Sequence, residues 1–234
     1  MDRPSNISVE VSWNKFCDSV RRSAERAGRR ADEIKIILVT KTIDEERIKA
    51  AWQAGAREFG ENRVQELLAK KKNLSSEFRW HLIGHLQTNK VRQILGETVL
   101  ILSLDRTELA VEIDSQARKL KIPKVPCLIQ VNMAGEITKS GFKLDEVENF
   151  VKDFPLDSPV EIKGLMVIGP HTDKEPEIRK VFRKTRELRD NLKKRFSSRN
   201  WEILSMGMSG DYPIAIEEGA TMIRVGTAVF GDRS

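Results

Sequence analysis

Cysteine is scarce in this chain of 234 residues, which contains only Cys17 and Cys127. The two lie far apart, one in a helical pattern and the other in a strand-like run. This spacing excludes a disulfide framework and the closely spaced cysteine pairs of zinc and redox sites. We therefore expect two buried thiols that behave as small apolar side chains.

Long apolar runs are absent as well. No stretch approaches the roughly 20 apolar residues that a membrane-spanning helix requires. Residues 1–6 lead directly into an amphipathic segment, without the apolar core of a signal peptide or the composition of a transit peptide. The sequence predicts a cytoplasmic protein without a membrane partner.

Histidine is also rare, with only His81, His85 and His171. The first two straddle a predicted strand end instead of sharing a helical face, and the third has no pattern of cysteine or acidic residues beside it. No metal site is therefore expected.

The net charge of +6 favours an anionic ligand or weak contact with nucleic acid. Basic residues alternate with acidic ones, however. In residues 174–199, apolar residues recur at helical spacing, which indicates a helix with one buried face and a solvated face of both positive and negative charges. The aromatic and glycine-rich modules of RNA-binding proteins are missing. Nucleic acid is not expected as a partner, although salt-sensitive RNA binding through the basic surface stays open as an alternative.

Eight short strand-like runs alternate with helical stretches along the chain. The predicted strands are residues 35–40, 57–60, 79–83, 99–104, 125–132, 161–168, 202–206 and 222–225. The predicted helices are residues 44–54, 62–72, 89–95, 107–120, 144–153, 175–196 and 212–218. Strands apolar on both faces indicate a parallel sheet covered by helices, and eight such units predict an α/β protein with a closed (β/α)8 barrel, the TIM barrel. A doubly wound open sheet is the alternative, but the glycine-rich phosphate turn that should follow its first strand is missing.

The end of the chain is short, because only nine residues follow Val225, too few for an eighth helix of ordinary length. Residues 7–28 form an extra N-terminal amphipathic helix, with one side made by Val11, Phe16, Val20 and Ala24. We expect this helix to cover the barrel where the eighth is short. The chain is thus predicted to be one domain, with residues 1–30 as a helical cover and residues 31–234 as the barrel.

Lys41 follows the first predicted strand and shares a face with Ile37 and Val39. Its amine would project past aliphatic carbon at the C-terminal end of the barrel, where barrel proteins place their active groups. Partial desolvation there favours the neutral, nucleophilic amine that forms Schiff bases. The alternative is a lysine whose stem packs while its head reaches water.

The loops after the seventh and eighth strands carry a second signal, in the small and hydroxyl-bearing residues Ser209, Gly226 and Thr227. Barrels often bind phosphate between these loops, through backbone N–H groups and helix N-termini. Turn glycines and helix caps would give the same pattern. Together with Lys41, the loops fit a ligand with a carbonyl at one end and a phosphate at the other. Pyridoxal 5′-phosphate has this form, as does the substrate of a sugar-phosphate aldolase.

Seven short motifs of a known protein family occur in order along the chain. They are VTKT at 39–42, FGENRVQE at 59–66, WHLIGHLQTNK at 80–90, KSG at 139–141, GLM at 164–166, SMGMS at 205–209 and RVGT at 224–227. Together they closely resemble the pyridoxal phosphate homeostasis protein family over residues 34–231.

The resemblance implies a single barrel of the alanine racemase N-terminal type, with pyridoxal 5′-phosphate (PLP) as cofactor, held as a Schiff base on Lys41. It also implies that Ser209, Gly226 and Thr227 bind the phosphate.

Further site residues come from the same resemblance. Arg224 is implied to face the pyridine nitrogen of the cofactor, while Asn62 and His81 are implied to line the pocket. Lys139 matches a second lysine that contacts the cofactor transiently.

Two features argue against strong catalysis. A permanently protonated Arg224 would donate a hydrogen bond to the pyridine nitrogen and keep it unprotonated, which makes the ring a weaker electron sink. Racemisation also needs a second acid or base, which alanine racemase takes from a tyrosine in an additional β domain without a counterpart here. The only tyrosine, Tyr212, is expected to pack or cap beside the phosphate loop. No catalytic residue is assigned.

These observations predict a monomeric protein of intracellular PLP homeostasis, which binds the cofactor, buffers it and passes it to PLP-dependent apo-enzymes. Robust turnover is not expected. The alternative is a PLP-dependent amino-acid racemase of narrow scope, using Lys41 with Tyr212 or a water.

Overall fold

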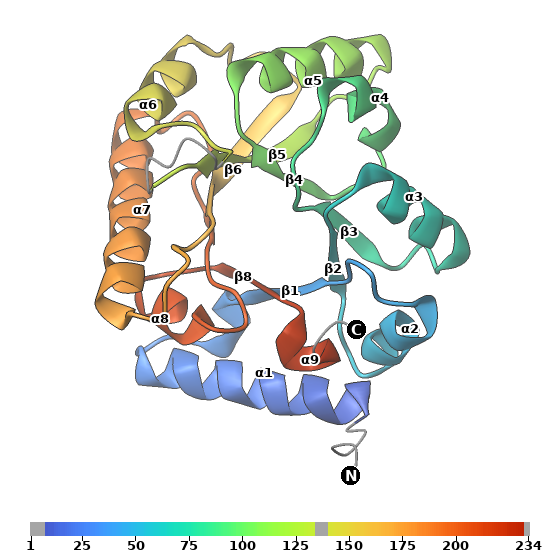
Figure 1. The fold of residues 1–234 in the computed structure, drawn as a ribbon. Coiled ribbons are helices and arrows are strands. Elements are labelled where there is room, and N and C mark those ends of the chain that lie inside the picture. Colours follow the sequence, from blue (N-terminus) through green and yellow to red (C-terminus); the bar gives the residue numbers. More distant parts are fainter. Residues whose placement is uncertain (1–7, 134–139, 232–234) are drawn as a thin grey trace.

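Eight parallel strands close into a barrel in chain order, because β1 pairs with β8 as well as with β2 (Figure 1). The structure is a computed structural model that describes residues 8–133 and 140–231. The strands are β1 Lys35–Val39, β2 Glu58–Glu61, β3 Arg79–Leu82, β4 Leu100–Leu104, β5 Val125–Val131, β6 Val160–Val167, β7 Ile203–Ser205 and β8 Met222–Val225. The predicted TIM barrel is confirmed.

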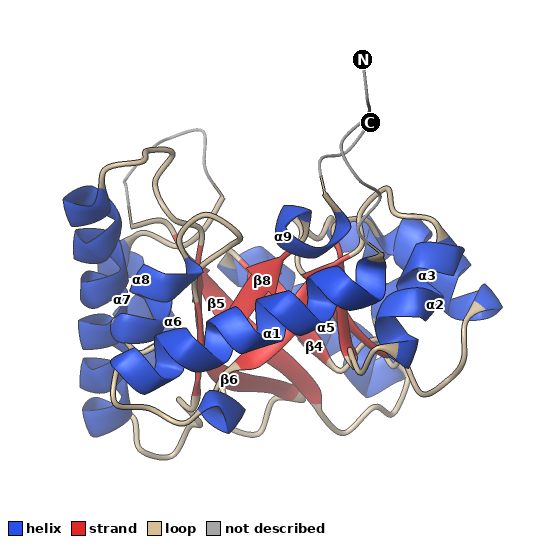
Figure 2. Ribbon diagram, turned by 90° about the horizontal axis from the view of Figure 1, so that it is seen from below, coloured by secondary structure: helices blue, strands red, loops and turns tan. Residues whose placement is uncertain are grey.

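Helices surround the barrel and follow the predicted segments closely. They are α1 Val9–Arg26, α2 Glu45–Gln53, α3 Val64–Asn73, α4 Val91–Ile94, α5 Thr107–Lys119, α6 Leu144–Asp153, α7 Glu175–Arg195, α8 Tyr212–Glu217 and α9 Thr227–Phe230, with 3-10 segments η1 Ala31–Glu33 and η2 Thr88–Lys90. The predicted helix at 89–95 is shorter than expected, because its first residues belong to η2. Seen from the side, the loops after the strands gather at one end of the barrel, together with α9 (Figure 2).

Alternation along each strand divides the apolar side chains into two cores. The barrel interior is filled by Ile37, Leu100, Leu102, Leu128, Met166 and Met222. Leu38, Phe59 and Trp80 point outward, into the larger core between sheet and helices. Lys41 lies two residues beyond the end of β1, in the turn at the mouth of the barrel.

The N-terminal helix α1 packs across the seam where the barrel closes, against α8, α9 and α2 (Figure 1). Its buried face is made by Trp13, Phe16, Val20 and Ala24. The prediction was wrong at Val11, which is 43% exposed, because the helix is rotated so that Trp13 takes the buried place. As expected, α1 covers the barrel where β1 meets β8, because α9 has only four residues and is too short to cover this seam.

One glycine allows β6 and β7 to approach each other closely. Gly164 in β6 has φ +143° at a shift of register between β5 and β6. A Cβ built there would lie 1.8 Å from the Ile203 carbonyl oxygen of β7. The position therefore requires a residue without a side chain.

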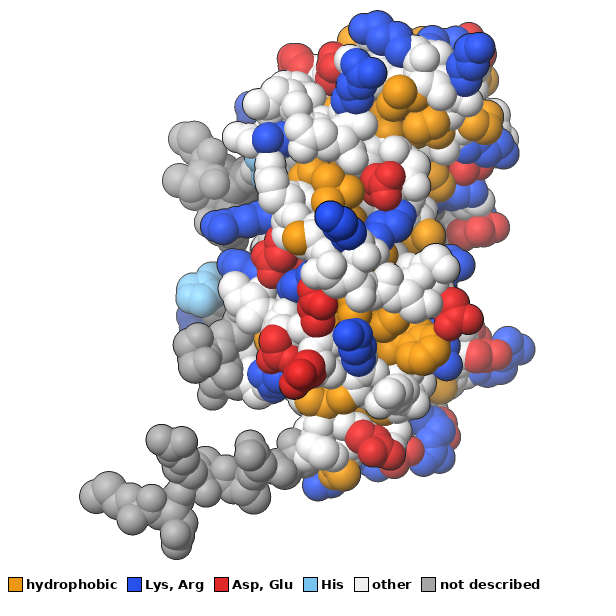
Figure 3. All heavy atoms as spheres, turned by 90° about the vertical axis from the view of Figure 1, so that its right-hand side faces the viewer, with side chains coloured by type: hydrophobic (Ala, Val, Ile, Leu, Met, Phe, Trp, Pro, Cys, Tyr) orange, Lys and Arg blue, Asp and Glu red, His pale blue; other side chains and the backbone are white. Residues whose placement is uncertain are grey.

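The two thiols are free, as expected. Cys127 is buried, whereas Cys17 is only half-buried, and burial raises the pKa of Cys17 to about 11. Within residues 8–133 and 140–231, no helix is long and apolar enough to cross a membrane. The face that carries α2, α3 and α4 mixes basic and acidic side chains (Figure 3).

Candidate functional site

Lys41 lies just beyond β1, half-buried, in a turn between the buried Thr40 and the exposed Thr42. The neighbouring strand is β8, whose Arg224 and Val225 pair with Ile37 and Leu38 of β1. The turn that follows β8 therefore begins beside the turn that carries Lys41. The structure brings the predicted lysine and the predicted phosphate loop to adjacent strands at one end of the barrel.

The loops after β7 and β8 meet at the hydroxyl of Ser209. Its Oγ accepts hydrogen bonds from the backbone N–H groups of Gly226 at 3.4 Å and Ala228 at 3.3 Å. Both bonds are longer than the usual distance of about 2.9 Å. Thr227, the first residue of α9, is exposed between them. Two backbone N–H donors thus converge on the Ser209 hydroxyl beside the exposed Thr227, an arrangement that an anion's oxygen atoms could use.

Close packing shapes the loop that carries Ser209. Gly207 has φ +95°, and a Cβ on it would lie 2.6 Å from the Ala215 Cβ. The N–H of Met208 donates to the Asp211 carboxylate at 2.5 Å. Burial raises the pKa of Asp211 although this N–H and the charge of Arg224 act against it.

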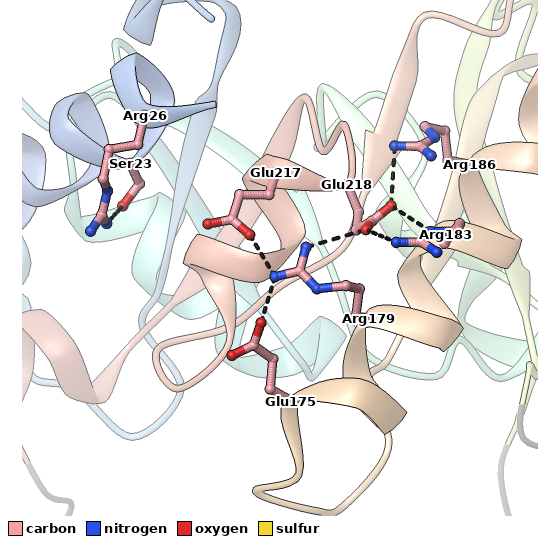
Figure 4. Close-up of polar contacts among 8 residues, drawn as sticks. All are labelled: Ser23, Arg26, Glu175, Arg179, Arg183, Arg186, Glu217 and Glu218. Carbon is pink, nitrogen blue, oxygen red and sulfur yellow. Dashed lines mark hydrogen bonds and ion pairs between the residues drawn. The ribbon is translucent and has the colours of Figure 1, made fainter. Parts of the chain in front are cut away.

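Helix α8, which follows the loop, is bound to α7 through Glu218 (Figure 4). This carboxylate is only 3% exposed and lies 3.3, 3.0 and 3.1 Å from nitrogens of Arg179, Arg183 and Arg186. Burial acts to raise the pKa of Glu218, but the arginines lower it overall. The cluster fixes the helix that supports the candidate phosphate loop.

Arg224 points into the barrel below the mouth and is 5% exposed. Its guanidinium donates to the Ser205 hydroxyl at 2.6 Å and to the Val167 carbonyl at 2.9 Å. Burial lowers the pKa of Arg224 to about 10, against the opposing charge of Asp211. The group therefore stays protonated at neutral pH, and the described bonds take two of its five N–H donors. Ser205, which accepts this hydrogen bond from Arg224, was not predicted as a site residue, although it lies in the same SMGMS motif as Ser209.

Asn62 lines a cavity of about 330 Å³ at the mouth, together with Ile83, His85 and Gln130. Its position depends on Gly84, because a Cβ there would lie 2.4 Å from the Asn62 carbonyl oxygen. The His85 ring, at this cavity, is 2.7 Å from the Asp105 carboxylate.

His81 lies inside the barrel, 1% exposed, with its Nε2 2.6 Å from a carboxylate oxygen of Glu58. Burial lowers the pKa of His81, so the ring is neutral at neutral pH and donates Nε2–H to the carboxylate. It is not among the residues that line the cavity of Asn62. Its role toward a cofactor stays a prediction. Lys139 lies outside the described residues.

Tyr212 packs on the outside of the barrel. Its hydroxyl is 2.7 Å from the Ser19 hydroxyl of α1, and its ring meets Phe16 edge to face at 5.0 Å. The expectation that this tyrosine packs is confirmed, and the hydroxyl is engaged with α1.

A buried polar group behind Lys41 was missed from the sequence. Lys70 of α3 is 7% exposed and contacts Glu61, Glu66 and the carbonyl oxygen of Thr40. The sequence feature that could have indicated it is the spacing of four residues between Glu66 and Lys70. This spacing places both side chains on one face of the predicted helix, where they can form an ion pair.

Comparisons with known proteins agree with this geometry. Over residues 17–234 the chain matches the family described as alanine racemase, N-terminal domain. It is 42% identical over 222 residues to the pyridoxal phosphate homeostasis protein of Aquifex aeolicus, covering 94% of this chain and 96% of that protein. The protein of that name from Haemophilus influenzae is 34% identical over 231 residues, covering 97% of each. PipY of Synechococcus elongatus PCC7942, solved with PLP bound, is 34% identical with a TM-score of 0.80, covering 91% of this chain and 100% of that chain.

Proposed function

This chain belongs to the pyridoxal phosphate homeostasis proteins of the alanine racemase N-terminal domain family, and from that premise we propose that it binds PLP on Lys41 and buffers it. The observation that carries the proposal is that Lys41 follows β1 while the N–H groups of Gly226 and Ala228, which converge on the Ser209 hydroxyl, follow the neighbouring β8. An amine and an anion site at one mouth suit a ligand that is an aldehyde at one end and a phosphate at the other.

The residues present fit this cofactor. The long bonds from Gly226 and Ala228 to Ser209 are ones that a phosphate oxygen could replace or share, with Thr227 as a further donor. PLP supplies a reactive aldehyde. Lys41 would hold it through its amine in a reversible condensation that releases one water molecule, so that hydrolysis could free the cofactor again.

Arg224 would set the character of the bound cofactor. Its guanidinium remains protonated and has donors beyond those that Ser205 and Val167 accept. Facing a pyridine nitrogen, it would donate a hydrogen bond and leave that nitrogen without a proton. Such a ring withdraws electrons weakly, which supports storage of the cofactor over turnover of amino acids.

The racemase alternative required Tyr212 or a water as the second acid or base. Because the Tyr212 hydroxyl bonds Ser19 of α1, outside the barrel, it is poorly placed for this role. We therefore favour a cytoplasmic carrier that acts as a monomer and passes PLP to PLP-dependent apo-enzymes.

Absorbance tests the binding site. Purified protein titrated with PLP should develop the visible band of a lysine-bound aldehyde, and borohydride reduction followed by peptide mass spectrometry should locate the label on Lys41. Lys41→Ala should lose the band, while Lys49→Ala, an exposed lysine of α2, should keep it. A band that survives Lys41→Ala would contradict the proposal.

Transfer needs its own experiment. Loaded protein is mixed with a PLP-dependent apo-enzyme and an excess of an aldehyde trap, and recovery of the apo-enzyme's activity is followed. Recovery that survives the trap supports direct delivery, and recovery that the trap abolishes means release into solution. Solvent-deuterium exchange at the α-carbon of an amino acid, dependent on Lys41, would instead favour the racemase.

A further inference from the structure

The two peptide groups on either side of Lys41 are both held by helix α3. Lys70 Nζ donates to the carbonyl oxygen of Thr40 at 2.7 Å, on the N-terminal side of Lys41. On the other side, the N–H of Thr42 donates to Glu66 Oε1 at 2.7 Å. Glu66 and Lys70 are themselves paired at 2.8 Å, one helical turn apart. One ion pair therefore holds the backbone at both ends of a single residue.

This pair, which we call the clamp, also contacts a buried carboxylate, that of Glu61. Glu61 is fully buried and its Oε1 accepts from Lys70 at 2.7 Å and from the Thr40 hydroxyl at 2.6 Å. Burial raises the pKa of Glu61, although these hydrogen bonds act against it. A lysine that is 7% exposed among three oxygen acceptors cannot be replaced without leaving buried polar groups unpaired.

The clamp lies on the outer side of the barrel wall, between α3 and the ends of β1 and β2. Thr40 and Glu61 have the parity of the outward-facing residues Leu38 and Phe59, so their side chains point away from the barrel interior. Lys41 itself lies in the turn after β1, at the mouth of the barrel. Any effect of Glu66 and Lys70 on cofactor binding must therefore pass through the backbone of Lys41.

That backbone is strained where the clamp holds it. Thr42 has φ +63°, a left-handed conformation that a β-branched residue rarely adopts. Within the described part of the chain, Lys121 is the only other non-glycine residue with positive φ. Strain of this kind persists where surrounding contacts enforce it, and it is common beside functional groups.

We propose that Glu66 and Lys70 are positioning residues, which fix the turn of residues 40–42 so that the Lys41 amine is presented to the aldehyde in a reactive orientation. The inference rests on the proposed function of Lys41. Without the clamp, Thr42 relaxes out of the left-handed region, the amine samples other directions, and the Schiff base forms more slowly. A role confined to attaching α3 to the barrel would change stability alone.

Two measurements separate these roles, and each is made on the full chain. The first is the rate of appearance of the visible band when PLP is added to cofactor-free protein. The second is hydrogen exchange of the Thr42 amide in cofactor-free protein, which reports directly on the bond to Glu66 because Thr42 itself is exposed. The second measurement does not depend on the cofactor at all.

The variants are chosen in matched pairs. Glu66→Ala removes the acceptor of the Thr42 N–H, whereas Glu66→Gln keeps an amide oxygen there. Lys70→Met removes the buried amine, and Lys72→Met makes the same change at an exposed position of α3. Thr42→Gly, added to Lys70→Met, supplies a residue that adopts positive φ without strain.

We expect Glu66→Ala and Lys70→Met to slow band formation by roughly tenfold or more and to speed Thr42 exchange by a similar factor. Glu66→Gln and Lys72→Met should stay within about twofold of the parent protein, and Thr42→Gly should recover part of the rate lost in Lys70→Met. Equal rates of band formation in Glu66→Ala and in the parent would overturn the clamp. If Lys70→Met fails to fold, Glu66→Ala, on a side chain 24% exposed, still decides the question. A parent protein that forms no band refutes the proposed function instead, and Thr42 exchange then tests the clamp alone.

Discussion

Replacing Glu58 by glutamine should destabilise the protein at neutral pH and remove part of its sensitivity to acid. Glu58 lies inside the barrel with its carboxylate 2.6 Å from His81 Nε2, 2.9 Å from Arg79 Nε and 3.3 Å from Lys35 Nζ. Burial acts to raise the pKa of this carboxyl, but the hydrogen bond from His81 and the nearby positive charges lower it to about 2. Glutamine has nearly the same shape and no charge.

The magnitude follows from that pKa. A fall from the ordinary value of 4.5 to about 2 corresponds to about 3 kcal/mol of stability, at roughly 1.4 kcal/mol for each pH unit. Because the neutral His81 ring contributes only its hydrogen bond, and because Arg79 and Lys35 are 52% and 44% exposed so that solvent screens their charges, about 2 kcal/mol is the expected loss. A depressed pKa stabilises the fold above pH 4.5, and this stability is lost as the pH falls from 4.5 toward 2. At pH 3.5 about 1 kcal/mol of it should already be gone.

Urea unfolding followed by tryptophan fluorescence measures the effect. At pH 7 and pH 5.5 the free energy of unfolding of Glu58→Gln should lie about 2 kcal/mol below that of the parent protein, and this difference should narrow to about 1 kcal/mol at pH 3.5. Glu77→Gln, an exposed carboxylate, serves as the control and should follow the parent throughout. Curves for Glu58→Gln and the parent that run parallel from pH 7 to pH 3.5 would refute the reasoning.

Two further predictions concern the barrel and its seam. Gly164→Ala should destabilise the protein by at least about 3 kcal/mol, because its Cβ would lie 1.8 Å from the Ile203 carbonyl oxygen. Gly210→Ala should cost far less, since no atom lies within 4 Å of a Cβ there, and thermal unfolding compares the two. Tyr212→Phe should cost about 1 kcal/mol through loss of the bond to Ser19 and leave the visible PLP band unchanged. Loss of that band with an intact fold would instead place the Tyr212 hydroxyl in the cofactor site.

The sequence was informative wherever apolar residues repeat with a clear period. Strands apolar on both faces and helices with one apolar face could be recognised without any knowledge of their neighbours, so the barrel and its element order were predicted. The buried face of α1 was wrong at Val11, because periodicity alone cannot distinguish two faces that differ by a small rotation when both carry apolar residues. Trp13 decides the outcome through the volume it buries.

The polar interior was much harder to predict. Lys70, Lys71 and Lys72 are consecutive, and only the three-dimensional packing shows that the first is buried while the third is exposed. Charged residues on a helix usually belong to its solvated face, so the clamp had no distinctive pattern. His81 lies in the WHLIGHLQTNK motif, whose family resemblance implies that it lines the cofactor pocket. In the structure its ring is hydrogen-bonded to Glu58 of the neighbouring strand, a contact that the motif does not indicate. Such pairings depend on strand register, which a single sequence does not reveal.

The closure of β1 against β8 has a consequence for synthesis of the protein. Lys41 is translated well before Gly226 and Thr227, so the two halves of the candidate site cannot lie side by side until β8 has left the ribosome. A nascent or prematurely terminated chain would have the Lys41 amine but not the candidate phosphate-binding residues Gly226 and Thr227. We expect such fragments to retain PLP poorly, so that stable capture of the cofactor reports a completed barrel and spares the cell's supply from unfinished chains.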